Sequence, residues 1–259
     1  ATTTTGTTST TTTATTLPPS LVTLFCMTVL GDLGRDVELV KAQFVRHAGI
    51  FACDEHAVFA EGREVMLGLG PDSRPESTRL IPPLGNTSRR LGGSNASSDR
   101  RQRRRAELFL RVWDAVARDA LHDNSRWTVK VDPDTVFFAA RLRSYLGRYP
   151  SVGTNLYVLN CEEPRTLFGS LEVLSRHATE VYLGQMDTCK DKLLKLDMPE
   201  DRFLSQCLDE LGVGHVNGFS LLSDRRCKQV SCTDTSKAAL GGFRDDNSWV
   251  QCWGKSVLR

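Results

Sequence analysis

The amino-acid sequence predicts a single α/β domain, and three observations lead to this prediction. After the first 20 residues, an apolar run, an amphipathic segment and a second apolar run follow one another, which is the β-α-β order typical of α/β folds. Residues 106–131 continue the alternation with a long amphipathic helix and an alternating strand. The chain of 259 residues is long enough to bury one full hydrophobic core.

The opening elements are predicted from apolar spacing. Residues 21–30 form a mostly apolar run that is too short to span a bilayer, which needs about 20 residues, so we predict a buried strand. Residues 36–47 carry apolar side chains at helical spacing, and residues 50–53 are predicted as a second strand that ends at Asp54. Residues 68–105 are rich in Gly, Pro, Ser and Arg, so we predict a long disordered insertion there.

The second half of the chain adds four predicted segments. Residues 106–121 repeat apolar positions every three to four residues and are predicted as a helix, and residues 127–131 alternate as a strand does. Residues 139–146 fit a helix, residues 167–183 a buried turn and helix, and residues 201–211 a further helix with one apolar stripe.

The amino-terminal segment has a different composition from the rest. Residues 1–16 contain 12 Thr and almost no apolar side chains, so they cannot bury a core and are predicted to be disordered. A Thr-rich tract that leads into Pro residues is typical of an O-glycosylated stalk, and a low-complexity tail without a role is the alternative. We therefore divide the chain into a stalk or tail, residues 1–20, and a folded domain, residues 21–259.

The charge balance excludes a dedicated nucleic-acid binder. The chain carries 33 Lys and Arg against 31 Asp and Glu, a formal net charge of +2, so we expect no nucleic-acid partner. The arginine-rich run at residues 100–105 closes the insertion and is predicted as a solvated loop. A nuclear signal, a protease site and a polyanion-binding patch are the alternatives for that run.

The eight cysteines bear on the cellular compartment. No Cys-x-x-Cys pair exists, so a zinc ribbon is excluded, and Cys26 and Cys53 lie in apolar runs and are predicted as buried free thiols. The other six crowd into the second half of the chain, which favours disulfides and an oxidising compartment over six reduced cysteines in the cytosol. Two glycosylation sequons, at Asn86 and Asn95, point the same way.

A pair of carboxylates follows the strand predicted at residues 127–131. Asp132 and Asp134 are two positions apart, so in extended backbone both side chains lie on the same side, at the carboxyl end of a strand where α/β sheets bind ligands. Two such carboxylates suit Mg²⁺ or Mn²⁺, and such a metal would also bind a diphosphate. The alternative is an ordinary Asp-Pro-Asp turn that closes a strand.

Two enzyme classes use such a motif. In haloacid-dehalogenase-type phosphatases Asp132 would be the phosphorylated nucleophile and Asp134 the acid/base, but that motif usually lies near the start of its domain and is followed by a glycine that this chain lacks. In sugar-nucleotide glycosyltransferases the motif lies in the middle of the domain and binds the metal–diphosphate of the donor. The position in this chain favours the second class.

Three further segments bring a family resemblance. Leu-Phe-Gly-Ser-Leu-Glu-Val-Leu-Ser-Arg-His-Ala at residues 167–178 follows the carboxylate pair, Cys189 and Cys207 flank Pro-Glu-Asp-Arg at residues 199–202, and Leu-Gly-Val stands at residues 211–213. In this order the segments resemble the Fringe-like β1,3-glycosyltransferases, in particular divergent dinoflagellate-type members. The resemblance covers residues 21–259 with a gap across the predicted insertion, and it implies a GT-A-like three-layer α/β/α sandwich around a mostly parallel mixed sheet.

The resemblance implies a function and a role for each site residue. The function is an inverting, metal-assisted transfer of a hexose from a UDP-sugar to a hydroxyl of a glycan or glycoprotein acceptor. Asp132 and Asp134 would bind the donor diphosphate and the divalent metal, Mn²⁺ or Mg²⁺, and Asp54 is a further donor-binding candidate. Asp201 would be the general base that removes the acceptor proton. For Asp201 the alternative is a carboxylate that stabilises the start of a helix.

The chain departs from the family pattern at one expected metal ligand. Related chains carry a His near the carboxyl terminus, and Gly241 stands at the matching position. Either diphosphate oxygens and water complete the metal site, or Arg244 or Lys237 neutralises the diphosphate in place of the His. The third possibility is a non-catalytic relative that binds a sugar or a nucleotide.

The resemblance also implies a disulfide and a location. Cys189 and Cys207 are expected to pair, and another bridge is expected among Cys227, Cys232 and Cys252. The family works in the secretory pathway, so we expect a type II membrane protein of the Golgi lumen whose anchor lies outside this chain. The expected partners are therefore the donor, the acceptor, and a membrane only through that anchor.

Overall fold

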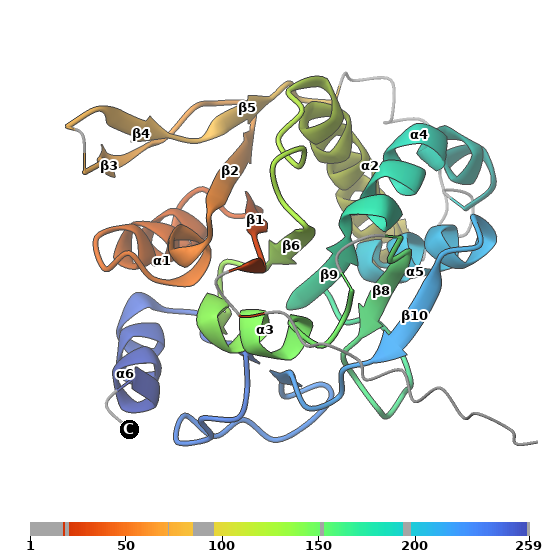
Figure 1. Ribbon diagram of the computed structural model, residues 1–259. Coiled ribbons are helices and arrows are strands. Elements are labelled where there is room, and N and C mark those ends of the chain that lie inside the picture. The colour runs from red at the N-terminus through yellow and green to blue at the C-terminus, as the bar shows by residue number, and fades with distance from the viewer. Residues whose placement is uncertain are drawn as a thin grey trace, which may run out of the picture.

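A seven-stranded sheet of mostly parallel strands forms the centre of the domain, in the order β10-β8-β9-β6-β1-β2-β5 (Figure 1). The computed structural model describes residues 18, 21–71, 73–84, 96–150, 153–193 and 198–257. The strands of this sheet are β1 (Leu24–Leu30), β2 (Glu55–Glu61), β5 (Arg79–Ile81), β6 (Trp127–Val131), β8 (Leu156–Leu159), β9 (Leu171–Ser175) and β10 (Gly214–Asn217). The mixed α/β fold in one domain that the sequence predicts is confirmed.

Two small sheets and six α-helices complete the described part of the fold. The small sheets contain β3 (Met66–Leu69) with β4 (Pro75–Ser77), and β7 (Val136–Phe137) with β11 (Leu222–Ser223) and β12 (Ala239–Leu240). The helices are α1 (Arg35–Phe44), α2 (Ala96–Arg118), α3 (Ala139–Leu146), α4 (Arg176–Leu193), α5 (Glu200–Glu210) and α6 (Asp246–Val257), with a 3₁₀ turn at Gly49–Ala52. None of the helices in the described ranges combines the length and the apolar character that crossing a membrane requires.

Helices cover both faces of the large sheet, which makes three layers. Helices α2, α4 and α5 pack against one face, and α1 and α3 against the other (Figure 1). Strand β1 shows why both faces are apolar: Phe25 and Met27 point into the first layer, and Leu24 and Cys26 into the second. Parallel strands that are buried on both faces read as continuous apolar runs, which is the pattern that predicted this strand.

The topology gathers several loops at one edge of the sheet. Strand β1 is parallel to β2 and β6, while β9 is antiparallel to its neighbours β6 and β8. The carboxyl ends of β1, β6 and β8 therefore lie at the same edge as the amino end of β9. Because ligands of α/β sheets bind where such ends meet, this edge is the place to look for a site.

Two predicted segments differ from the observed fold. The predicted strand at residues 50–53 is a 3₁₀ turn, and the strand begins only at Glu55, because Ile50 fills the core from a turn as well as it would from a strand. The predicted turn and helix at residues 167–183 contain strand β9 before helix α4, and the charged residue Glu172 in the middle of that strand hides it.

The prediction of a disordered insertion over residues 68–105 is wrong where the structure describes it. Strands β3, β4 and β5 lie within residues 66–81, and helix α2 begins at Ala96. The arginine-rich run is helical because Arg is a good helix former and acidic side chains pair with it: Arg104 contacts Glu61. Residues 85–95, both sequons and nearly all of the Thr-rich tail lie outside the described residues.

All eight cysteines are paired in four disulfides. The bridges are Cys26–Cys53, Cys161–Cys227, Cys189–Cys207 and Cys232–Cys252. The prediction that Cys26 and Cys53 are free thiols is wrong, because β1 runs beside the segment that leads into β2 and brings their Cα atoms within 6.1 Å. The bridge between Cys189 and Cys207, which the family resemblance implies, is confirmed and joins α4 to α5.

Candidate functional site

The candidate site begins where β6 ends. Asp132 follows the last residue of β6, and its Oδ1 lies 3.0 Å from Lys130 Nζ and 3.2 Å from Arg105 Nη2. Lys130 belongs to β6 and Arg105 to helix α2, so two elements far apart in the sequence supply the cations. The negative charge of Asp132 is therefore already balanced within the protein.

Asp134 is in a different electrostatic state. Its carboxyl is partly buried, and no side chain in the described ranges donates a hydrogen bond to it or forms an ion pair with it. Burial raises the pKa of Asp134 to about 6, and the negative charges of Asp132 and Asp224 contribute to the increase. A carboxylate in this state gains from a nearby cation, because opposite charge favours its ionised form.

Lys130 is the centre of a buried charge network. Only 1% of its side chain is exposed, and its Nζ donates to the Gly169 carbonyl at 2.8 Å and contacts Glu172 at 3.2 Å and Glu200 at 3.3 Å. Burial alone lowers the pKa of Lys130, but the surrounding carboxylates outweigh this effect and raise it, so the ammonium stays charged. Lys130 thereby ties β6, β9, α5 and the turn before β9 together.

Glu172 and Glu200 share this buried space, and their negative charges repel each other. Burial raises the pKa of Glu172 well above its usual value, the charge of Glu200 raises it further, and Lys130 offsets only part of the increase. Glu172 Oε2 and Glu200 Oε1 are buried, and no other described residue forms a hydrogen bond with either oxygen. We therefore predict that the two carboxyls share one proton in the folded protein.

This shared proton predicts a pH-dependent stability. Because the pKa of Glu172 is raised on folding, the folded state keeps a proton that the unfolded state has lost, and the free energy of unfolding falls as pH rises from about 4.5 towards the raised pKa. The slope reaches at most about 1.4 kcal/mol per pH unit for one proton. We expect Glu172→Gln, which cannot ionise, to remove this decline.

The measurement is urea unfolding between pH 5 and pH 8. The control is Glu210→Gln, because Glu210 is exposed and pairs with Lys192 at the surface. At every pH we compare the free energy of unfolding of each variant with that of the parent protein. A Glu172→Gln curve that runs parallel to the Glu210→Gln curve would show that the carboxyl pair holds no extra proton.

Asp201 reaches the same edge from helix α5. It lies in the first turn of α5, where its Oδ1 accepts a hydrogen bond from its neighbour's backbone N–H at 2.8 Å, and its Oδ2 accepts one from the Gly169 N–H at 3.0 Å. A Cβ on Gly169 would lie 3.2 Å from Lys130 Nζ and 3.4 Å from Asp201 Oδ2. The absence of a side chain on Gly169 therefore lets the helix approach the end of β6.

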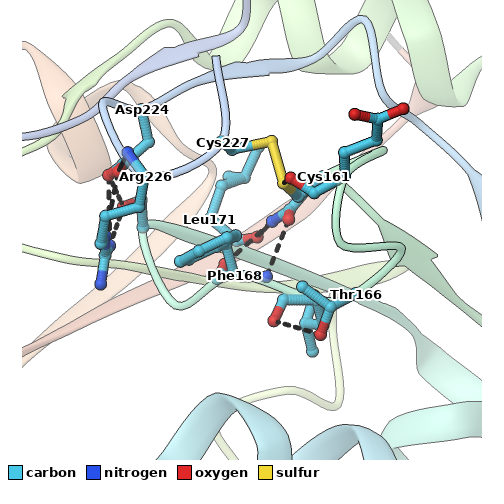
Figure 2. Close-up of a disulfide and its surroundings, with 11 residues drawn as sticks. Cys161, Thr166, Phe168, Leu171, Asp224, Arg226 and Cys227 are labelled. Carbon is cyan, nitrogen blue, oxygen red and sulfur yellow. Dashed lines mark hydrogen bonds and ion pairs between the residues drawn. A yellow bond between two sulfur atoms is a disulfide. The ribbon is translucent and has the colours of Figure 1, made fainter.

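A further acidic residue, Asp224, lies close to Asp134. Its Oδ2 accepts a hydrogen bond from Ser170 Oγ at 2.6 Å. Arg226 Nε donates to Asp224 Oδ1 at 3.0 Å (Figure 2). A Cβ on Gly241 would lie 2.3 Å from Asp224 Oδ2 and 3.0 Å from Ser170 Oγ. Asp224 thus fills the space that a side chain at residue 241 would need.

The structure places Asp54 away from this site, and among the described residues it shows no contact of Lys237 or Arg244 with the site carboxylates. Asp54 bonds to the Leu24 N–H at 2.7 Å and to Arg143 Nη2 at 2.8 Å, which places it at the opposite edge of the sheet, where β1 begins. Lys237 is buried and donates to a backbone carbonyl at 2.9 Å. Arg244 is exposed and forms no hydrogen bond or ion pair within the described ranges. The assignment of Asp54 to the donor site is therefore corrected.

Sequence reasoning missed four residues of this site: Lys130, Arg105, Asp224 and Arg226. Lys130 occupies a polar position in an alternating strand and gives no signal of being buried. The composition of the arginine-rich run that contains Arg105 predicts a loop, and only the helical structure shows that Arg105 faces Asp132. Asp224 and Arg226 follow a strand of two residues, β11, which is too short for a periodic signal.

The donor set of the site fits a divalent cation that brings part of its own coordination shell. Within the described ranges, no group of three or more His, Cys, Asp or Glu side chains could hold a metal. Asp132 and Asp134 supply carboxylate oxygens, and the carboxyl of Asp134 has a raised pKa and no cationic partner among the described residues. Mg²⁺ commonly takes one or two carboxylates together with water and phosphate oxygens, so these two residues fit such an ion.

Two hollows on the described surface lie away from the carboxylate pair. One, of about 410 Å³, is lined by residues of β2, β4 and β5, and the other, of about 380 Å³, is lined by β8, β10 and α5. Ser205 lines the second hollow, one helical turn beyond Asp201 on α5. The carboxylates themselves lie at the open edge of the sheet.

Comparisons with known proteins identify similar folds. No protein-family model and no curated protein matches the chain. Among solved structures, a glycosyltransferase involved in glycosylation of the major capsid of PBCV-1 is 9% identical, with a TM-score of 0.47 over 92% of this chain and 100% of the other. The glycosyltransferase GlyE of Streptococcus pneumoniae TIGR4 is 12% identical, with a TM-score of 0.36 over 76% of this chain and 45% of the other.

The bifunctional glycosyltransferase WbbM, solved in its apo form, is a third similar structure. It is 10% identical, with a TM-score of 0.43 over 93% of this chain and 51% of the other. The chain therefore spans about half the length of GlyE and of WbbM. These structural neighbours are all glycosyltransferases, and their identities and TM-scores are low.

Proposed function

We propose that this chain is a Fringe-like glycosyltransferase that transfers a hexose from a UDP-sugar to an acceptor hydroxyl with inversion. One observation carries the proposal: Asp132 and Asp134, the expected donor and metal ligands, lie at the same edge of the sheet as Asp201, the expected base. Lys130 contacts Asp132 and the Gly169 carbonyl, and the N–H of the same glycine bonds to Asp201. The capping role of Asp201 alone would not require that link.

In the proposed reaction Asp201 acts on the acceptor. Its carboxylate accepts the proton of the acceptor hydroxyl, the acceptor oxygen forms a bond to the anomeric carbon of the sugar, and the bond from that carbon to the diphosphate oxygen breaks. The electron pair of the broken bond leaves with UDP. Attack from the side opposite the leaving group inverts the anomeric carbon.

Asp132 and Asp134 are the proposed donor side of the site. They would hold Mn²⁺ or Mg²⁺, which when bound would offset negative charge on the leaving diphosphate. Lys130 and Arg105 hold the Asp132 carboxylate in place from two different elements. Asp134 supplies the carboxylate whose charge is not yet balanced.

A non-catalytic relative that binds a nucleotide or a sugar is the second candidate. The pairing of Asp132 with two cations favours it, because a carboxylate held by Lys130 and Arg105 binds a metal less strongly. The absence of a ligand side chain at Gly241 favours it too. The two candidates differ in one result: only the enzyme releases UDP from a UDP-hexose.

The chemistry of the chain supports a secretory location and a matching set of partners. The four disulfides of the described domain are stable in an oxidising compartment, so we propose the Golgi lumen, with a membrane anchor outside this chain. The partners proposed are the UDP-sugar and a glycan or glycoprotein acceptor. The near-neutral net charge of +2 supports a protein without a nucleic-acid partner.

The test is UDP binding by calorimetry with and without Mn²⁺. We expect UDP binding to depend on the metal, and Asp134→Asn to weaken it about 10- to 100-fold, because the variant lacks the charge that holds the cation. Asp187→Asn is the control, since Asp187 is 89% exposed and lies on α4.

Three outcomes would count against parts of this proposal. UDP binding that changes neither with the metal nor with Asp134→Asn would contradict the assignment of the donor site. Binding without release of UDP from any UDP-hexose would select the non-catalytic relative. A phosphoryl group trapped on Asp132 after incubation with phosphate esters would select the phosphatase alternative.

A further inference from the structure

We propose that Arg226 binds the diphosphate of the nucleoside-diphosphate donor and supplies a fixed positive charge beside the site carboxylates. This inference rests on the proposed function. It assigns this role to Arg226 instead of Arg244 or Lys237, because Asp224 fixes the guanidinium of Arg226.

The guanidinium of Arg226 is held in one orientation. Its Nε donates to Asp224 Oδ1 at 3.0 Å, and its Nη2 donates to Asp224 Oδ2 at 3.2 Å, which is the two-bond geometry that fixes an arginine against a carboxylate (Figure 2). The same Nη2 lies 3.1 Å from Ser170 Oγ, and the guanidinium carbon lies 4.7 Å from the centre of the Phe168 ring.

Arg226 keeps binding capacity despite these contacts. Its side chain is 57% exposed, and its Nη1 donates to no residue in the described part of the chain. An ordered guanidinium with free N–H groups at the surface suits an anion, because little side-chain freedom is lost when the anion binds.

The position of Arg226 fits the diphosphate of the proposed donor. The hydrogen bond with Asp224 raises the pKa of Arg226, and the negative charges of Asp132 and Asp201 raise it further. The backbone N–H of Asp132 donates to the Ser170 carbonyl at 3.4 Å, and the hydroxyl of the same serine lies 3.1 Å from Arg226 Nη2. The guanidinium therefore lies within electrostatic reach of the residues assigned to the metal and to the acceptor proton.

A disulfide holds this arrangement. Cys227 follows Arg226 in the chain and bonds to Cys161, which comes just after β8 (Figure 2). Next to Cys161, Asn160 Nδ2 donates to the Phe168 carbonyl at 2.9 Å, so the bridge joins the loop of Arg226 to the turn that carries the Phe168 ring. The arginine is thus positioned before any ligand arrives.

The absence of a side chain at residue 241 is a condition for this placement of Arg226. A Cβ on Gly241 would approach Asp224 Oδ2 to 2.3 Å, closer than real Cβ contacts, so any side chain there would displace Asp224. Asp224 in turn holds Arg226. A metal ligand at residue 241 and an arginine fixed by Asp224 therefore exclude each other, and this chain carries the arginine.

The sequence-derived candidates do not offer the same features. Lys237 donates its Nζ to the Ser220 carbonyl at 2.9 Å and is buried. Arg244 is exposed, but no contact among the described residues fixes its side chain. Arg226 alone of the three is both exposed and fixed by several side-chain hydrogen bonds.

The experiment measures binding of UDP and of uridine by calorimetry at fixed salt and Mn²⁺. We expect Arg226→Gln to weaken UDP binding about 10- to 100-fold, the range for losing a hydrogen bond to a charged group, and to leave uridine binding within about twofold. Arg225→Gln is the matched control, because Arg225 is the exposed neighbour and should leave both affinities unchanged.

The outcomes separate this inference from the proposed function. If the parent protein binds no UDP, the proposed function fails. If the parent binds UDP and Arg226→Gln binds it equally well, only the role of Arg226 is overturned, and an equal loss for uridine and UDP overturns it too. Should Arg226→Gln fail to fold, Arg226→Lys keeps the charge without the two-bond geometry; we then expect an intermediate loss, and parental UDP affinity would overturn the inference.

Discussion

Replacing Lys130 with methionine is expected to lower the free energy of unfolding by about 3–5 kcal/mol, the usual effect of removing one partner from a buried ion pair. Lys130 is fully buried, and its Nζ lies within 3.3 Å of three carboxylates and within 2.8 Å of the Gly169 carbonyl. Without the ammonium, these groups repel one another in a space that excludes water. Urea unfolding at pH 7 measures the loss.

Two further variants show whether burial is the cause. Lys192→Met removes an exposed lysine whose Nζ lies 2.8 Å from Glu210, and a surface pair of this kind contributes at most about 1 kcal/mol. Adding Glu172→Gln to Lys130→Met should restore part of the lost stability, because one of the unbalanced carboxylates is then neutral. A Lys130→Met protein as stable as Lys192→Met would contradict the buried network.

The same network bears on the chemistry of the site. Lys130 contacts Asp132 directly and reaches Asp201 through the two backbone groups of Gly169. A single buried ammonium thus fixes the spacing between the proposed donor carboxylate and the proposed base. Residues that hold such a spacing without touching substrate are positioning residues. Replacing them lowers the reaction rate, because a small displacement of the catalytic groups has a large effect on the rate.

Much of the fold could be predicted from the sequence where apolar spacing was regular. Strand β6 and helices α3 and α5 follow their predicted ranges closely, because each buries one face or both faces against the core. The secondary-structure predictions were wrong where charged residues form ion pairs with residues of other elements. Glu172 hides a strand and the arginine-rich run hides a helix, since Lys130 and Glu61, which pair with Glu172 and Arg104, are distant in the sequence.

The candidate site was predictable in part for the same reason. Asp132 and Asp134 are visible because their spacing at the end of a strand is local information. Asp201 was recognisable only through the order of its family-like segments, while Arg226 depends on a contact with Asp224 and on a disulfide between Cys161 and Cys227. The pairing of Cys26 with Cys53 was missed because two apolar runs do not reveal that they lie side by side.

Asp201→Asn is expected to lower kcat about 10²- to 10⁴-fold, the usual contribution of a general base, while UDP binding stays unchanged. The amide keeps the shape of the carboxylate, and its oxygen still accepts the hydrogen bond from the Gly169 N–H, so the link to the turn before β9 survives. What the variant loses is the charge that accepts the acceptor proton. The measurement is UDP release from a panel of UDP-hexoses with saccharide acceptors, together with calorimetric UDP binding.

The matched control separates catalysis from helix capping. Asp246 lies in the first turn of α6 and accepts a hydrogen bond from the next residue's backbone N–H at 2.9 Å, as Asp201 does in α5 at 2.8 Å. If both aspartates merely stabilise helix starts, Asp246→Asn and Asp201→Asn each lower the free energy of unfolding by up to about 1 kcal/mol. In that case kcat of both variants stays at the parental value. A large loss of kcat in Asp201→Asn only, with parental UDP affinity, is the result that a base at this position requires.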